Sequence, residues 1–216
     1  MPTSLLTKVA LGTLGVGTVA TGSVYLGKGL IISKTKISIE DLIDKFNPEK
    51  RFISFGDNHH WNEAWKAYRE GNKDLWNISK ITSTSTTSAP KEFMDACDSK
   101  KSQEVLDKSD PLYSQVVKYC TRDTLVRDLI NENEDRSLLE KGHNFKGDGD
   151  WKTVWDLYKN DNSGSSDKWA INTWSSIKSE TNAPAAFADM CIKRSEVKAH
   201  DLANPDYLDV LKYCTK

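Results

Sequence analysis

Four cysteines are the residues whose type and spacing most directly predict a chemical bond. Cys97 and Cys120 lie 23 positions apart, and Cys191 and Cys214 have the same separation. Two equally spaced pairs favour two equivalent disulfides, which persist outside the reducing cytosol. Free buried thiols are the alternative, and zinc is less favoured because no C-x2-C or cysteine–histidine spacing accompanies the cysteines.

Histidines give a weaker signal. His59 and His60 stand next to each other before Trp61 and could bind a metal ion. Adjacent side chains point apart on a helix, however, and the second half of the chain has Gly149 and Asp150 at the matching positions. We therefore expect a polar turn here and no metal site.

Motifs typical of enzymes are absent from the sequence, including HExxH, GxSxG, the Walker loop and the Rossmann glycine pattern. Acidic pairs such as Glu132 with Glu134 could act as glycosidase carboxylates. With 31 acids among 216 residues, such pairs are expected on any solvated face. The sequence therefore predicts that the protein is not an enzyme and has no cofactor.

The charges divide the chain into a basic head and an acidic body. Thirty basic and 31 acidic residues leave a net charge of -1, which gives no reason to expect a nucleic-acid partner. Residues 1–36 contain four lysines and no acid, so the other 180 residues hold 26 basic and 31 acidic groups, a net charge of -5. Seven tryptophans and 38% hydrophobic residues indicate that this body is folded.

The body that must position the cysteines is a tandem duplication. A shift of 94 positions aligns residues 89–121 with 183–215 and gives 13 identities in 33 positions, where unrelated sequences would share about two. Offsets of 90 and 87 extend the match upstream, so the offset changes in the loops. We predict a segment 1–36 followed by two units, 37–122 and 123–216. This division selects a disulfide within each unit, Cys97 with Cys120 and Cys191 with Cys214.

Each unit is expected to be mainly α-helical. Trp61, Trp65 and Tyr68 form one stripe of a helix that stops at Gly71, and the second unit repeats the stripe. Two further helices are predicted in each unit, and they begin at Pro90, Pro111, Pro184 and Pro205. Each disulfide would join the last two helices of its unit. The polar stretches 79–88 and 160–167 are expected to be loops, with a short edge strand as the alternative for the first.

Tryptophans are the side chains that could form a ligand surface. The Trp61 and Trp65 stripe is expected to be core, because tryptophans at this spacing on an amphipathic helix usually are. Trp76, Trp169 and Trp174 lie where the two units diverge. We therefore expect these three to be exposed and to be the candidates for ligand contact.

The head has the length of a membrane segment. Residues 9–27 carry no charge and are rich in glycine and threonine, which membrane helices tolerate. A retained membrane anchor is favoured over a cleaved secretory signal because the apolar character resumes at Leu30. The lysines after the segment favour a cytoplasmic body, whereas two disulfides favour an exported one. We give the cysteines more weight and expect an extracellular body.

Three features resemble paralogous families of uncharacterised proteins in haemotropic mycoplasmas: the head MPTSLLTKVALGTLGVGTVATGSVYL, the Trp-x3-Trp helix and the ending LxVLKYCTK. The resemblance covers essentially the whole chain. It implies a membrane-tethered protein of a wall-less bacterium that lives on red cells, with surface display and antigenic variation. No cysteine follows the apolar head to carry a lipid, so the helix itself must be the anchor.

These observations predict a single-pass cell-membrane protein whose extracellular body is an interaction or antigenic module. The membrane would be contacted through the N-terminal segment, and host surface proteins or antibodies would be its partners. The alternatives are a structural or decoy antigen without a dedicated ligand and a membrane-tethered cytoplasmic scaffold.

Overall fold

The computed structural model describes residues 35–71, 74–78 and 87–216. In this part of the chain the structure is mainly helical, with nine α-helices and two disulfides, which confirms the predicted helical class. The predicted membrane segment lies outside the described residues. Among the described helices, none combines the length and the apolar character needed to cross a bilayer.

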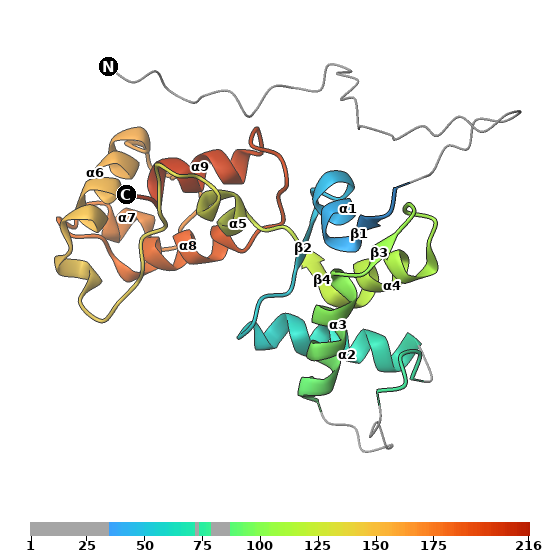
Figure 1. The fold of residues 1–216 in the computed structure, drawn as a ribbon. Helices are drawn as coiled ribbons and strands as arrows, with labels where there is room; N and C mark the ends of the chain where they lie inside the picture. The colour runs from blue at the N-terminus through green and yellow to red at the C-terminus, as the bar shows by residue number, and fades with distance from the viewer. Residues whose placement is uncertain (1–34, 72–73, 79–86) are drawn as a thin grey trace, which may run out of the picture.

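The first unit combines four helices with two small antiparallel sheets (Figure 1). Strand β1 pairs with β3, and β2 pairs with β4, with Phe52 opposite Thr121. In chain order the elements are β1 (Ile37–Ser38), α1 (Ile39–Phe46), β2 (Lys50–Phe52), α2 (Asn58–Gly71), α3 (Lys91–Lys101), β3 (Glu104–Val105), α4 (Pro111–Cys120) and β4 (Thr121–Asp123).

The second unit repeats this plan with single bridges in place of the sheets. Leu125 pairs with Lys198, and Leu138 pairs with Thr215. It also contains a 3-10 helix and a short helix that have no described counterpart in the first unit. In chain order the elements are α5 (Val126–Asn131), η1 (Phe145–Gly147), α6 (Gly149–Asp161), α7 (Trp174–Ile177), α8 (Ala185–Ser195) and α9 (Pro205–Tyr213).

The helix starts follow from their capping residues. Before α4, the Asp110 side chain accepts a hydrogen bond from the backbone N–H of Leu112 at 2.8 Å, and Pro111 occupies the first turn. Before α9, Asn204 accepts from Asp206 at 2.9 Å in the same way. At the predicted Pro90 start, the proline is the cap of α3, and the helix begins one residue later.

Each unit has its own aromatic core around a fully buried tyrosine. In the first unit, the Tyr68 ring contacts Trp65, Trp76, Phe93 and Tyr119 at centroid distances of 4.9 to 5.9 Å. The second unit repeats this arrangement around Tyr158. The two cores are separate clusters, because one runs from Ile39 to Cys120 and the other from Val126 to Cys214.

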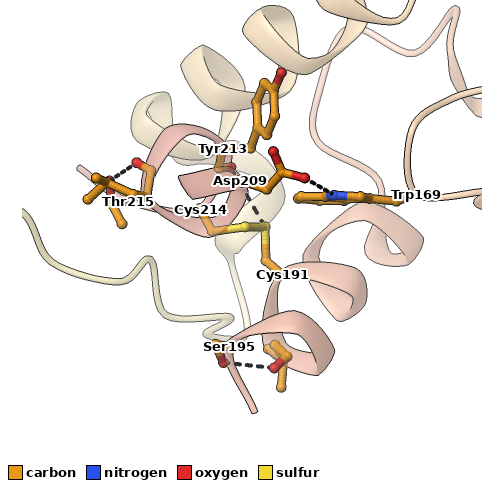
Figure 2. Close-up of a disulfide and its surroundings, with 9 residues drawn as sticks. Trp169, Cys191, Ser195, Asp209, Tyr213, Cys214 and Thr215 are labelled. Carbon is orange, nitrogen blue, oxygen red and sulfur yellow. Dashed lines mark hydrogen bonds between the residues drawn. A yellow bond between two sulfur atoms is a disulfide. The ribbon is translucent and has the colours of Figure 1, made fainter. Parts of the chain in front are cut away.

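A disulfide joins the last two helices of each unit, as predicted. Cys97 on α3 is bonded to Cys120 on α4, and Cys191 on α8 is bonded to Cys214 beside α9. Figure 2 shows the second bond next to Trp169, whose indole N–H donates to Asp209 at 3.4 Å. The bond therefore crosslinks the helices at the edge of the aromatic core.

Replacing Cys97 and Cys120 by alanine should lower the free energy of unfolding of the first unit by roughly 3 kcal/mol, because the unfolded chain is no longer closed into a loop. Urea unfolding of the full-length chain, followed by circular dichroism, measures this loss. The matched variant without Cys191 and Cys214 should lose a similar amount, since the sequence separation is the same. Identical unfolding curves with and without a reductant would contradict both bonds.

Candidate functional site

Each unit holds one tryptophan in the same way. The residues beside this tryptophan differ between the units. The Trp61 indole N–H donates to the carbonyl of Ser54, and the Trp151 indole N–H donates to the carbonyl of Glu140, both at 3.0 Å. Each ring also packs edge-on against a phenylalanine, Phe93 on α3 or Phe187 on α8. The two indoles are therefore structural equivalents.

The loop before this tryptophan differs in length between the units. Twelve positions separate Leu139 from Trp151, whereas eight separate Ile53 from Trp61. Leu139 and Ile53 are equivalent, because each donates its backbone N–H to the carbonyl of the second cysteine of its unit. The second unit therefore has four extra residues in this loop, and the loop also contains η1.

The longer loop covers Trp151 with an aromatic ring. Phe145 on η1 lies edge-on to Trp151, with ring centroids 5.7 Å apart, and is 9% exposed. Lys141 of the same loop lies over the Phe145 ring at 5.6 Å and forms an ion pair with Asp189 of α8. The tryptophan is thereby closed off by an aromatic side chain and a lysine.

The corresponding place in the first unit is partly open, and Trp61 is 7% exposed against 1% for Trp151. Phe55 aligns with Phe145 at the offset of 90, but its side chain is 98% exposed. A groove of about 560 Å³ lies beside Trp61, and its apolar wall includes Phe52 and Met94. We call this cavity the Trp61 groove. Its lining includes Trp61, the equivalent of the tryptophan that Phe145 covers in the second unit.

Charged side chains form the rim of the Trp61 groove. Lys91 pairs with Asp95 at 2.6 Å, and Lys101 pairs with Asp98 at 3.1 Å. Asp95 aligns with Asp189, the residue that the covering loop of the second unit engages through Lys141. The groove therefore offers an aromatic surface with a carboxylate at its edge, which suits an aromatic side chain that has a cation nearby.

The three tryptophans expected at a ligand surface lie elsewhere. Trp169 and Trp174 are each 3% exposed, so their predicted exposure is wrong. Trp76 is half-buried, stacks on Phe93 at 6.0 Å and donates its indole N–H to Gln115. Ligand contact by these three residues stays a prediction without an open face to support it.

The burial of Trp169 has a physical cause that sequence divergence concealed. Asp167 accepts hydrogen bonds from the Tyr158 hydroxyl at 2.5 Å and from the Trp169 backbone N–H at 2.9 Å. This turn brings Trp169 against the Tyr158 ring at 4.7 Å. Trp174 packs edge-on against Trp155 at 5.9 Å, so α7 contributes to the core. Trp76 and Trp169 stand 93 positions apart, at comparable places in the two units, and this repeated tryptophan is the sequence signal of a core position.

The tyrosine hydroxyl at the centre of each core is shielded from water. Burial raises the pKa of Tyr68 to about 12, and the neighbouring Asp74 carboxylate acts in the same direction. Burial and a hydrogen bond to Asp167 also raise the pKa of Tyr158. Both groups stay neutral at physiological pH and serve as structural hydrogen-bonding groups.

One group of three side chains in the described part of the chain can supply metal ligands. His59, His60 and Glu63 each place one donor atom within 4.8 Å of the others. The histidine rings approach each other with centroids 5.2 Å apart, although the residues are adjacent. Side chains of adjacent residues diverge on a helix, but Glu63 one turn later lies close enough to His59 to complete a set of three donors.

Truncating Phe145 tests whether this ring fills the second unit's counterpart of the Trp61 groove. Phe145→Ala should lower the free energy of unfolding by about 2 to 3 kcal/mol, because a buried aromatic side chain is lost. The matched variant Phe55→Ala should change it by less than about 0.5 kcal/mol, since that ring is exposed. Urea unfolding of the full-length chain measures both, and equal losses would contradict the difference between the units.

Comparisons with known proteins give no indication of function, so the geometry of the site is the basis for a functional conclusion. No protein-family model matches the chain. No curated protein and no solved structure matches it either.

Proposed function

We propose that this protein is a surface-displayed interaction module in which the Trp61 groove binds a partner. The observation that carries the proposal is the difference between the units: the second covers its tryptophan with Phe145, whereas the first leaves an apolar groove beside Trp61. Since the cores are otherwise alike, the first unit exposes a surface that this fold can cover with its own chain.

The proposed partner presents an aromatic side chain next to a lysine or arginine. This chemistry is taken from the covering loop, where Phe145 lies on Trp151 and Lys141 pairs with Asp189. In the first unit, Phe52, Met94 and the small exposed edge of Trp61 would contact the partner's ring. Asp95 would receive its cation. A protein segment of a host surface protein or of an antibody can provide both groups.

The proposed setting is the outer face of a cell membrane, with residues 1–36 as the anchor. The support is the pair of disulfides, one in each unit, because such bonds persist in oxidising surroundings. A structural or decoy antigen without a dedicated ligand is the competing function. It leaves the Trp61 groove without a saturable partner, so binding measurements separate the two.

Protease shaving of intact cells tests the proposed display. We expect trypsin added to intact cells to release peptides of the body. Non-reducing peptide mapping should recover Cys97 linked to Cys120 and Cys191 linked to Cys214. Lysed cells provide the control for protease access. A body that is cut only after lysis, with four free thiols, would instead identify a membrane-tethered cytoplasmic scaffold.

Binding of a synthetic peptide tests the Trp61 groove itself. The probe is the chain's own covering loop, residues 140–148, labelled for fluorescence anisotropy and titrated with the full-length protein in detergent micelles. We expect saturable binding that weakens about 3- to 10-fold in Phe55→Ala, because an aromatic contact worth about 0.5 to 1.5 kcal/mol is lost.

Two controls define the outcome of this titration. The same peptide with Phe145→Ala should lose binding, and the protein variant Leu208→Ala should bind normally, because that exposed side chain lies outside the groove. If the two peptides bind equally or neither saturates, the groove is not an aromatic docking site.

A further inference from the structure

The first two turns of α2 gather nitrogen and oxygen donors that the Trp61 groove does not use. His59 Nε2 lies 3.5 Å from a carboxylate oxygen of Glu63, four residues later on the same face of the helix. His60 places its donor atom within 4.8 Å of both. We propose that His59, His60 and Glu63 bind a zinc ion.

The separation of the donors fits a zinc site after small side-chain rotations. Zinc–ligand distances of about 2.1 Å place neighbouring ligands of a tetrahedral site about 3.4 Å apart. The pair His59 and Glu63 is already at this separation. Both side chains are well exposed, 77% and 64%, so they are free to turn toward the ion.

Asp57 provides the outer contact that orients histidine ligands at zinc sites. Its carboxylate lies 2.8 Å from Nδ1 of His60, so Nε2 is the nitrogen left for the ion. Asp57 is itself held by Arg122 at 3.4 Å and by Arg127 at 3.8 Å. The Asp57 carboxylate is therefore held in place beside His60.

The surroundings leave room for an ion and for a fourth ligand. The three donors line a cavity of about 670 Å³ between the first unit and Glu196 and Lys198 of the second. The Lys198 and Lys50 cations of this cavity both pair with Asp123, so their charges are partly compensated. Water or a side chain of a partner protein can occupy the open position on the zinc.

The donor set favours zinc over calcium or magnesium. Two imidazole nitrogens and one carboxylate oxygen are a common zinc set, whereas calcium and magnesium prefer oxygen ligands alone. The second unit is an internal control, because Gly149, Asp150 and Thr153 stand at the matching positions. Each chain therefore has one such zinc site, in the first unit.

Isothermal titration calorimetry with zinc chloride tests the site in the full-length, chelator-treated protein. We expect one ion per chain, with affinity reduced at least 10-fold in His59→Ala and in His60→Ala. Asp57→Asn should weaken binding about 10- to 100-fold, as expected for an outer-shell partner of a ligating histidine. His143→Ala and His200→Ala are the matched controls and should bind as the unmodified chain does.

A second measurement guards against variants that lose their fold. Zinc should raise the melting temperature of the unmodified chain and of Phe55→Ala, but not of the double variant His59→Ala/His60→Ala. Absence of zinc binding below about 100 µM, or binding unchanged in both histidine variants, would overturn the inference. The Trp61 groove shares no residue with this site, so a failure of either proposal leaves the other standing.

Discussion

The need to satisfy a buried hydroxyl at the centre of each unit fixes much of the structure around it. The Tyr158 hydroxyl donates to Asp167 at 2.5 Å and accepts from the Trp169 backbone N–H at 3.1 Å. An unpaired buried hydroxyl would cost free energy, so the segment after α6 must return to the tyrosine. Tyr68 imposes the same return in the first unit, where the Trp76 N–H donates to it at 2.8 Å. The returning tryptophan then completes the core beside the disulfide.

A second network of charges joins the two units. Arg122 at the end of the first unit forms two hydrogen bonds with Asp128 of α5, at 2.6 and 2.9 Å, and also approaches Asp57. Burial raises the pKa of Asp128, but these hydrogen bonds outweigh that effect and lower it. The proposed zinc ligands thus lie next to a junction that paired charges already hold in place. Because Asp57 belongs to this network and bonds His60, the movement of His60 is limited.

The duplication made the framework predictable, because equal spacing in the two copies identifies the disulfide partners. Prolines at matching positions indicate the helix starts. Burial in the divergent segments was not predictable in the same way. The differences between the copies around Trp169 predict a surface position, yet a hydrogen bond to Asp167 holds its backbone within the core. The Trp61 groove could not be predicted for a related reason. The change of offset between the copies indicates a loop insertion, but it does not indicate that Phe145 is buried and Phe55 is exposed.

The exposure of Phe55 carries an energetic consequence for the first unit. Burying a phenylalanine side chain is worth about 1.5 to 3 kcal/mol, and the second unit gains this contribution from Phe145. The first unit lacks it, so its Trp61 groove retains apolar surface in contact with water. A partner that inserts an aromatic ring removes that surface from water and gains the same kind of contact. Because the disulfide and the tyrosine-centred core hold the unit together without this ring, the proposed binding groove can stay open in the absence of a partner.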